Sequence, residues 1–387
     1  MASPSGWADL PEDILRKIFE KLPGAIDRAM GTLLCPYWRS VSMTITQSPL
    51  PLLLMAEGDR ISCRRVALGA RALPLPDGIA WRGARFLGAC GQSFAVEVAE
   101  HARRRTGRYA LVGFEGQATA LPDSLRVPFG GRSFDMRIHT VVGGPDYFAA
   151  IVTSTETTIA FWGVGVGETP YWTPPVFPDF RQITYWRCAL PPSPVDDVVQ
   201  ANGAFFVLTS KEGLHRYEPV ISQGVATLTM RKETVINENR LAPDPSGHTV
   251  ARYLCYVRGA KGAERFVLIR RYVLPGHGTV NFEVLWSRVQ GNDDGGPPTT
   301  RWSKLSHIRG SILFIGRGCS RSILTGRPCK GYIYFVDDAR FRDIQAGPYP
   351  RSDTGSLHYD EEAAEPTAIE FEQPSHPPSI SSPSIWF

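Results

Sequence analysis

Apolar residues recur at helical spacing in one part of the chain, close to its N-terminus. They follow the 3.6-residue period of an α-helix and form one stripe, which consists of Leu10, Ile14, Leu15, Ile18, Phe19 and Leu22. Asp9 and Glu12 have the spacing of a capping box, and Pro23 with Gly24 ends the pattern. The pattern therefore predicts an amphipathic helix that begins near residue 9 and ends near residue 22.

Two shorter helices are predicted after this one. The first covers residues 25–34, and the second follows Pro36 and contains Trp38. Three short helices cannot bury their apolar sides by themselves. The module is therefore expected either to pack on the domain that follows or to present an apolar face to a partner.

From about residue 59 the pattern changes to short runs of β-forming residues, which are separated by Gly, Pro and Asp. The clearest runs are Ala204–Thr209, Tyr253–Val257, Phe266–Val273, Phe282–Ser287, Ile312–Ile315 and Tyr332–Val336. No helical pattern of three turns interrupts them, so an antiparallel all-β domain is favoured over a parallel sheet with crossover helices. At about 40 to 50 residues per blade, a β-propeller would divide residues 49–350 into about six or seven blades.

The protein is thus expected to be mainly β with a small N-terminal α module, and to have three parts. These are a helical module in residues 1–48, a β-propeller-like domain in residues 49–350 and an acidic, Pro/Ser-rich tail in residues 351–387. Two interpretations of the tail stay open. Its composition is typical of a disordered segment. The aromatic residues Trp386 and Phe387, however, are costly to leave in water and favour docking of the last residues, PSIWF, on the β domain.

Composition and charge narrow the class of protein. Of the 387 residues, 43% are hydrophobic and 21% are charged, as in a globular protein, and 37 glycines with 32 prolines indicate many turns. The net charge of +4 is too small to indicate a nucleic-acid partner. The longest apolar run, residues 49–56, is too short to span a bilayer, and the N-terminus lacks the features of a signal peptide. We therefore expect a soluble protein of the cytoplasm or nucleus, not secreted, with no membrane partner.

The motifs that carry chemistry in other proteins are weak in this chain. The seven cysteines form no C-x-x-C pair and have no histidine at zinc-finger spacing, so reduced thiols and no metal are expected. The glycines of residues 163–167 lack the ending and the following helix of a phosphate-binding loop. His215 and Asp197 have no G-x-S-x-G serine to complete a hydrolase triad, and the pair Asp337–Asp338 more often caps a turn than binds a cation. We expect no catalytic residues and no cofactor.

The first forty residues resemble an F-box. The resemblance is carried by Leu10-Pro11-x-x-Ile14-Leu15-x-x-Ile18, by Leu22-Pro23, by Asp27-Arg28 and by Leu34-Cys35-x-x-Trp38-Arg39. It implies that the module binds a Skp-family adaptor protein and, through it, a cullin-RING ubiquitin ligase. The residues expected to form or support the adaptor interface are Leu10, Pro11, Ile14, Leu15, Ile18, Leu22, Leu34 and Trp38.

Beyond this module, the chain resembles plant F-box proteins of the KIB type, whose C-terminal domain is a predicted β-propeller. The segments that carry the resemblance are ETPYWTP (168–174), DVVQANGAFFVLTSKEGLHRYEP (197–219), RYLCYV (252–257), NFEVLW (281–286), RWSKLSHIRGSILFIG (301–316), YIYFVDD (332–338) and the terminal PSIWF. The resemblance implies that the propeller recruits an unknown protein substrate to the ligase, and that this subunit is not itself an enzyme.

A second function stays open because two residues depart from the F-box pattern. Gly31 lies within the predicted second helix, and Pro36 falls where the family usually has a basic or polar helical residue. A proline inside the third helix would remove a hydrogen bond and clash with the carbonyl of Thr32, so that this helix would start late or kink. The alternative is a ligase-independent protein-interaction module with a degenerate F-box.

Overall fold

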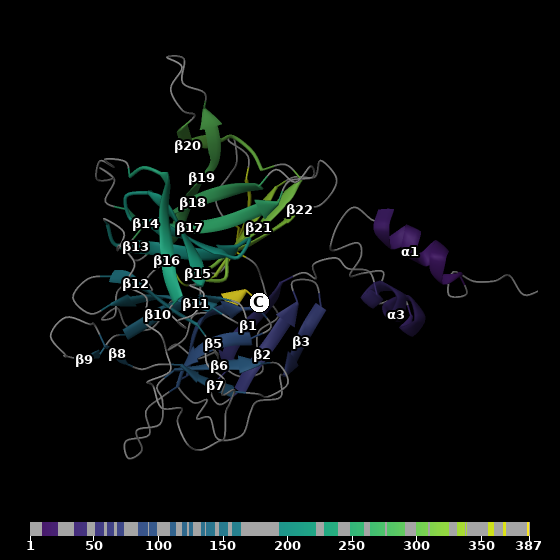
Figure 1. The fold of residues 1–387 in the computed structure, drawn as a ribbon. Coiled ribbons are helices and arrows are strands. Elements are labelled where there is room, and N and C mark those ends of the chain that lie inside the picture. The colour runs from purple at the N-terminus through teal and green to yellow at the C-terminus, as the bar shows by residue number, and fades with distance from the viewer. Residues whose placement is uncertain are drawn as a thin grey trace, which may run out of the picture.

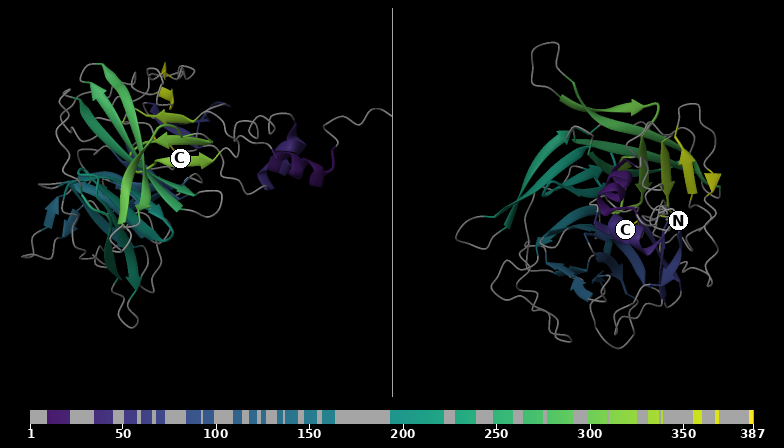
Figure 2. Two further views of the ribbon diagram at one scale, coloured as in Figure 1. Left: turned by 90° about the horizontal axis from the view of Figure 1, so that it is seen from above. Right: turned by 90° about the vertical axis from the view of Figure 1, so that its right-hand side faces the viewer.

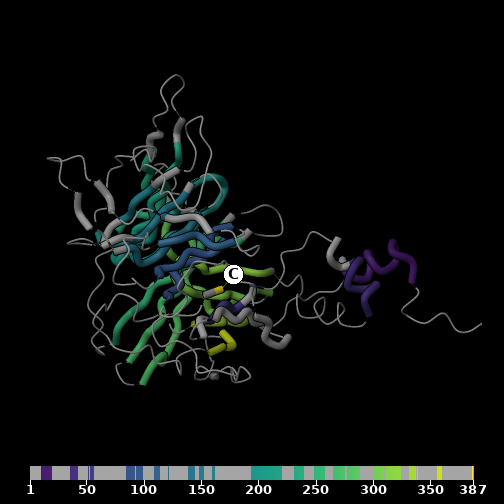
Figure 3. The backbone as a smooth tube through the Cα atoms, turned by 90° about the horizontal axis from the view of Figure 1, so that it is seen from below, coloured from purple at the N-terminus to yellow at the C-terminus, as the bar shows by residue number. Residues whose placement is uncertain are grey.

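The computed structural model of the protein contains two described helices and a large β domain (Figure 1). The residues that the structure describes are 10–21, 35–44, 51–57, 60–65, 68–72, 84–91, 93–98, 109–113, 118–121, 124–126, 133–135, 137–143, 147–153, 157–163, 193–221, 228–238, 248–258, 264–274, 277–290, 299–308, 310–324, 331–336, 338, 355–359, 367–368 and 385–386. The helices project to one side of the strands (Figures 1 and 3). The prediction of a mainly β protein is confirmed.

The two described helices are α1 (Glu12–Lys21) and α3 (Pro36–Thr44), and they pack against each other. Their contact buries a small apolar core, which consists of Leu15, Phe19, Trp38 and Val41. The rings of Phe19 and Trp38 meet edge to face, with their centroids 5.7 Å apart. The predicted second helix, residues 25–34, lies outside the described residues.

Helix α3 begins at Pro36, so the proline lies in its first turn and not in its interior. The first N–H groups of a helix have no carbonyl partner within it, so a proline in the first turn costs no hydrogen bond. The backbone N–H of Arg39 donates to the carbonyl oxygen of Cys35 at 3.1 Å, and the N–H of Trp38 donates to the Cys35 Sγ at 3.5 Å. Cys35 therefore caps a helix that Pro36 starts.

The strands form six sheets of three or more strands and one two-stranded ribbon among the described residues. Sheet 1 has the order β26 (Ile385–Trp386), β1 (Leu52–Glu57), β2 (Arg60–Arg65) and β3 (Leu68–Ala72). Sheet 2 consists of β4 (Arg85–Cys90), β5 (Ser93–Glu97), β6 (Tyr109–Gly113) and β7 (Ala118–Leu121). Sheet 3 consists of β10 (Arg137–Gly143), β11 (Tyr147–Thr153) and β12 (Thr157–Gly163). The separate two-stranded ribbon consists of β8 (Ser124–Arg126) and β9 (Ser133–Asp135).

The second half of the chain forms the remaining three sheets. Sheet 4 consists of β13 (Val195–Ala201), β14 (Ala204–Thr209), β15 (Leu214–Ile221) and β16 (Leu228–Ile236). Sheet 5 consists of β17 (Thr249–Arg258), β18 (Glu264–Leu274), β19 (Gly278–Gln290) and β20 (Thr299–Leu305). Sheet 6 has the order β22 (Arg321–Leu324), β21 (Ser311–Ile315), β23 (Tyr332–Phe335), β24 (Gly355–His358) and β25 (Thr367–Ala368). Between described strands, β21 and β23 alone form a parallel pair, which departs from the predicted antiparallel pattern.

The six sheets are arranged around a common centre (Figure 2). Strand β4 contacts β26 of sheet 1 and β10 of sheet 3, β13 contacts β10 and β17, and β17 contacts β22 of sheet 6. Each apolar core cluster of the β domain lies between neighbouring sheets. Because successive side chains of a strand point to opposite faces, Leu254 packs toward sheet 4 and its neighbour Tyr253 toward sheet 6. Strands buried on both faces explain the continuous apolar runs of the sequence, such as Ala204–Thr209.

Sheet 1 joins the first and the last described strand. Strand β26 pairs antiparallel with β1, with Leu53 opposite Trp386 and Leu54 opposite Ile385. The Trp386 side chain is fully buried, packs edge to face on Phe314 at 5.0 Å and donates its indole N–H to the carbonyl oxygen of Ile315 at 3.0 Å. Trp386 therefore links sheet 1 to sheet 6 and completes the ring.

The number of complete blades differs from the prediction. Among the described residues, sheets 1, 2, 4, 5 and 6 have at least the four strands of a propeller blade, whereas sheet 3 has three. Five complete blades are thus observed where the sequence predicts about six or seven. The prediction divided the length evenly, but the sheets are unequal: strand β19 alone has 13 residues, and residues 164–192, between β12 and β13, lie outside the described residues.

Candidate functional site

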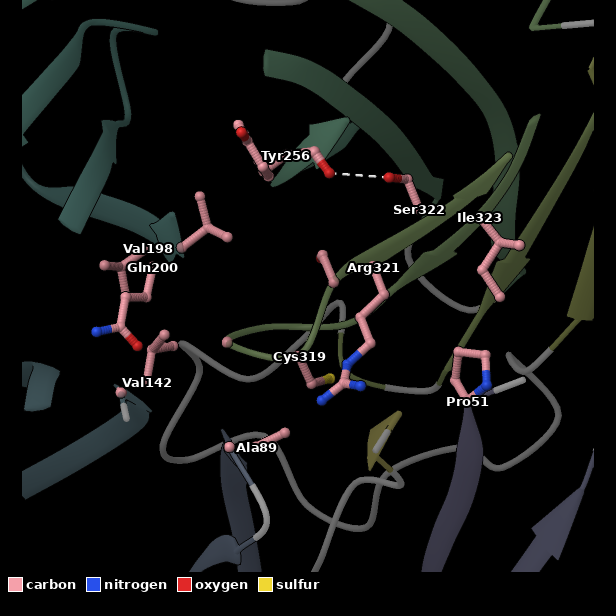
Figure 4. A pocket seen from close by; sticks show the side chains of 15 residues that line it. Pro51, Ala89, Val142, Val198, Gln200, Tyr256, Cys319, Arg321, Ser322 and Ile323 are labelled. Carbon is pink, nitrogen blue, oxygen red and sulfur yellow. Dashed lines mark hydrogen bonds between the residues drawn. The ribbon is translucent and has the colours of Figure 1, made fainter. Parts of the chain in front are cut away.

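A pocket of about 360 Å³ lies where the innermost strands of the six sheets converge. This volume lies within the range of small-ligand sites. Sheets 2 to 6 contribute to its lining, together with Pro51, which directly precedes β1 of sheet 1. The lining consists of Pro51, Ala89, Gly91, Val142, Gly143, Val198, Val199, Gln200, Tyr256, Gly318, Cys319, Ser320, Arg321, Ser322 and Ile323. Figure 4 shows Arg321 beside Cys319 and Pro51, with Val142 and Gln200 on another side of the pocket.

The turn between β21 and β22 places Cys319 and Arg321 at the pocket. Gly318 has φ +64°, and a Cβ atom there would lie 2.1 Å from the Cγ2 atom of Thr140, so that only glycine fits. The backbone N–H of Cys319 donates to the carbonyl oxygen of Gly316 at 3.0 Å and closes the turn. Through the Gly318 carbonyl, which accepts the N–H of Ala89 at 3.3 Å, the same turn is joined to sheet 2.

A buried carboxylate next to this turn connects three sheets. Asp197 lies on β13 and is fully buried. Its Oδ1 atom accepts the backbone N–H groups of Val198 at 2.9 Å and Gly318 at 3.0 Å, and its Oδ2 atom accepts that of Leu254 at 2.8 Å. Sheets 4, 5 and 6 thus share one side chain directly behind the pocket. Burial raises the pKa of Asp197 from 3.8 to about 7, and the amide donors and Arg317 oppose this shift only in part.

We expect the stability that Asp197 contributes to decline as the pH rises. With a pKa of about 7 in the folded state and 3.8 as its ordinary value, the folded protein keeps a proton that the unfolded chain releases between these two pH values. The contribution is complete below about pH 4 and is lost as the pH rises through 7, by at most about 1.4 kcal/mol per pH unit. Asp197→Asn removes the titration. Chemical denaturation at pH 5 and at pH 8 gives the free energy of unfolding of the wild type and of Asp197→Asn. The wild-type value minus the variant value should be smaller at pH 8 than at pH 5. A larger value at pH 8 would contradict the raised pKa.

A second buried network joins sheets 5 and 6. The Asp338 Oδ1 atom accepts the hydroxyl of Tyr253 at 2.7 Å and lies 3.4 Å from the Arg271 Nη1 atom, and its Oδ2 atom accepts the backbone N–H of Arg317 at 2.6 Å. The Arg317 Nη1 atom donates to the carbonyl oxygen of Asp196 on sheet 4 at 2.8 Å. Burial raises the pKa of both Asp338 and Tyr253. Asp338 thus accepts a backbone N–H of the turn between β21 and β22, and it also links this turn to sheet 5 through Tyr253 and Arg271.

The lining of the pocket combines one charged side chain with polar and apolar ones. Arg321 alone carries a charge among the described lining residues, beside the polar side chains of Gln200, Ser320 and Ser322. The Ser322 hydroxyl donates to the carbonyl oxygen of Tyr256 at 2.8 Å. Burial raises the pKa of the Cys319 thiol well above its usual value, so this sulfur stays protonated and is a poor nucleophile.

The described part of the chain contains no group of three His, Cys, Asp or Glu side chains that could hold a metal. His215 and Asp197, which the sequence offers as parts of a triad, have separate partners: the His215 Nδ1 atom lies 3.2 Å from the Thr234 hydroxyl, and Asp197 accepts backbone amides. Residues 164–167 of the glycine run lie outside the described residues. Within the described helices, no span is long and apolar enough to cross a membrane.

The residues predicted to bind an adaptor divide into three groups in the structure. Leu15 and Trp38 lie in the core between α1 and α3. Leu10 and Ile18 are half-buried against that core, whereas Pro11 and Ile14 are exposed. Leu22 and Leu34 lie outside the described residues. The helical period identified the apolar stripe, but it did not separate the residues that hold the helices together from those that face outward.

One exposed residue of the helix pair was missed in the sequence. Tyr37 on α3 is 39% exposed and Ile14 on α1 is 38% exposed, and these are the large hydrophobic side chains left exposed within the described residues. The position of Tyr37, next to the inward-facing Trp38 on a helix, is the signal that could have identified it, because adjacent helical residues are about 100° apart.

The pocket residues were also missed. They come from segments distant in the sequence, and neither Gln200 nor Arg321 belongs to a recognisable motif. The positions of six different sheets must be known before these residues can be assigned to one site.

Comparison with known proteins identifies the β domain. The model of the KIB1-4 beta-propeller family matches residues 66–359. No curated protein matches the chain at a significant level. Three solved structures show low similarity. HIRA(644-1017) has 13% identity and a TM-score of 0.25, and the match covers 60% of this chain and 55% of that chain. Human WBSCR16 has 11% identity, a TM-score of 0.28 and coverage of 65% of this chain and 78% of that chain, and BBS1N in complex with ARL6DN has 12% identity, a TM-score of 0.29 and coverage of 84% of this chain and 80% of that chain. TM-scores at this level add nothing to the description of the fold.

Proposed function

Since the chain belongs to the KIB1-4 β-propeller family, we propose that it is a protein-interaction subunit, specifically the substrate receptor of a Skp-cullin-F-box type ubiquitin ligase. In this proposal the helices bind a Skp-family adaptor and the β domain binds a protein substrate, in the cytoplasm or nucleus. The subunit carries out no catalysis itself. The F-box-like spacing of residues 10–39 and the match over residues 66–359 together support this division of roles.

The observation that carries the proposal is the outer surface of the helix pair. Leu10, Ile14 and Ile18 are four residues apart; Leu10 lies just before α1, and Ile14 and Ile18 share one side of that helix. Ile14, the middle one, is exposed, as is Tyr37 on α3, although both are large and apolar. The pair projects from the β domain, which leaves this surface accessible (Figure 1). Exposed apolar side chains on a small projecting module are typical of a protein interface.

The test is a double substitution on this surface, Ile14→Asp with Tyr37→Asp. Two charges in an apolar interface should weaken adaptor binding at least tenfold, because each anchor loses its buried area and each carboxylate must be desolvated. Binding is measured by isothermal titration of the full chain with a purified Skp-family adaptor. Leu15→Asp or Trp38→Ala would be less informative, since both side chains hold α1 and α3 together.

Arg16→Asp is the matched control. It introduces an aspartate, as the double substitution does, but about 200° around α1 from Ile14. It also removes an exposed ion pair with Glu12, which contributes little to stability. This variant should bind the adaptor as the wild type does. If the folded wild type binds no adaptor, or if the double substitution leaves the affinity unchanged, the receptor proposal is wrong.

A ligase-independent interaction module remains the second candidate, for one structural reason. Leu15 and Trp38, two large apolar residues of the F-box-like pattern, are buried in the core between α1 and α3. A helix pair whose main function is structural would have the same core. Failure of the wild type to bind an adaptor, with the double variant equally stable and folded, would favour this candidate.

A further inference from the structure

Three arginines lie side by side at one end of sheet 5, on three adjacent strands. In the register of β19 and β20, Arg288 is directly opposite Arg301. Between β18 and β19, Val267 is opposite Trp286, and the next positions outward on the same face are Arg265 and Arg288. Positions 265, 288 and 301 therefore form one row across one face of the sheet, which we call the arginine row.

The sheet does not neutralise the charge of the arginine row. Like charges on opposite residues destabilise a sheet, because their Cβ atoms are only about 4.5 to 5.5 Å apart. Glu264, next to Arg265 in the sequence, belongs to the other face, where it is opposite Arg258. Within the described part of the chain, Arg265 and Arg301 take no part in an ion pair. Other cations of sheet 5 do, namely Arg252, Arg270, Arg271 and Lys304.

Two further features prepare the arginine row for a partner. The Arg265 Cζ atom lies 4.0 Å from the centroid of the half-buried Trp286 ring. Stacking on the ring leaves the N–H donors at the edge of the guanidinium free and reduces the entropy lost when they bind an acceptor. Arg265 and Arg301 are both exposed, and β19 and β20 project beyond the neighbouring strands (Figure 1).

We propose that the arginine row binds a phosphorylated serine or threonine of a partner protein, with the phosphate held between neighbouring guanidinium groups. A phosphate monoester carries a charge of about −1.5 to −2 at neutral pH and has three acceptor oxygens, so it can accept donors from two arginines at once. A carboxylate carries less charge and has fewer acceptor oxygens, and it therefore matches a row of three cations less well. This inference rests on the proposed role of the β domain in binding a substrate, and it names phosphorylated segments as the substrate class.

The probe is a pool of short peptides that have phosphoserine fixed at the centre and random residues on either side. It is applied to the immobilised full chain, in parallel with an otherwise identical pool that has serine at the centre. We expect the phosphoserine pool to bind at least about tenfold more tightly, and less tightly as the salt concentration rises, because salt screens exposed charges. A single-stranded oligonucleotide tests the other class of phosphate-bearing partner. It should bind more weakly than the phosphoserine pool, since each of its phosphodiesters carries a single charge.

Substitutions in the arginine row test its role directly. Arg265→Gln with Arg301→Gln should weaken binding of the phosphoserine pool at least about tenfold. Arg265→Lys with Arg301→Lys keeps the charge but not the planar donors, and should retain part of the binding. Arg16→Gln with Arg231→Gln is the matched control, because it removes the same charge from two exposed positions on α1 and β16. It should bind the pool as the wild type does.

The proposal is wrong if the wild type binds both peptide pools equally or binds neither of them, as it would if an acidic segment of the same chain, such as residues 360–362, covered the row. It is also wrong if the oligonucleotide binds more tightly than the phosphoserine pool, or if the glutamine substitutions in the row have no more effect than the control. Adaptor binding is tested separately at Ile14 and Tyr37. A chain that binds the adaptor but no phosphopeptide would overturn this inference alone, and a chain that binds the phosphopeptide but no adaptor would overturn the receptor proposal alone.

Discussion

Replacement of Trp386 by alanine is expected to destabilise the β domain by about 3 to 5 kcal/mol, the usual cost of truncating a fully buried tryptophan. The side chain fills the space between sheets 1, 2 and 6, packs on Phe314 and forms a hydrogen bond with the Ile315 carbonyl. Its removal leaves a cavity and an unsatisfied buried carbonyl group. The loss is large because one residue closes the contact between the first and the last sheet.

Equilibrium unfolding in urea, followed by circular dichroism, measures this effect. Trp286→Ala is the matched control, since Trp286 is half-buried on β19 and stacks under Arg265, whose Cζ atom is 4.0 Å from the ring centroid. It should cost less than half as much as Trp386→Ala. Removal of residues 383–387 should destabilise the protein at least as much as Trp386→Ala. Equal midpoints for the wild type and Trp386→Ala would show that β26 does not hold sheet 1 to sheet 6.

Arg271→Met is expected to cost a similar amount, about 3 to 5 kcal/mol, because it removes one partner from a buried ionic network. Arg271 is fully buried on β18. Its Nε atom donates to the Thr279 hydroxyl at 2.7 Å and its Nη1 atom to the carbonyl oxygen of Val336 at 2.6 Å, and Asp338 lies 3.4 Å away. Without Arg271, the Asp338 carboxylate loses one of two buried counter-charges, the other being Arg317, and its pKa should rise further.

A double-substitution cycle separates this electrostatic effect from lost packing. Asp338→Asn in the Arg271→Met background should recover part of the stability, so the two changes together cost less than the sum of the single changes. Arg231→Met is the control for the loss of an arginine, since Arg231 is exposed and pairs with Glu218 at the surface. It should cost less than about 1 kcal/mol. Additive effects of Arg271→Met and Asp338→Asn would mean that the two side chains are not coupled.

The sequence predicted individual strands better than their arrangement. The run Ala204–Thr209 is strand β14 with the same limits, because a strand covered on both faces leaves an uninterrupted apolar signal. The predicted number of blades was wrong because strand lengths differ among the sheets. The total length of the domain does not reveal these differences. The parallel pairing of β21 with β23 left no sequence signal either, since strand direction is not encoded in the apolar pattern of each strand.

The site residues show where periodicity stops being informative. The same stripe contains Leu15, which is buried against α3, and Ile14, which is exposed. The period identifies a helix side but not what covers it. In the sequence, Asp197 is only part of an incomplete triad and Asp338 is predicted to cap a turn. Their burial depends on amide and hydroxyl donors from another sheet, such as Leu254 and Tyr253. Arg321 belongs to the pocket only because six separate sheets surround one point.

The pairing of β26 with β1 also affects when the protein can finish folding during synthesis. Strand β1 emerges early, but Trp386, which completes its sheet, is translated more than three hundred residues later. Until then the apolar faces of Leu53 and Phe314 lack their common partner. Pairing across such a sequence separation is slow, and exposed strand edges on an incomplete chain invite aggregation. The nascent β domain should therefore need protection by chaperones until residue 386 has left the ribosome.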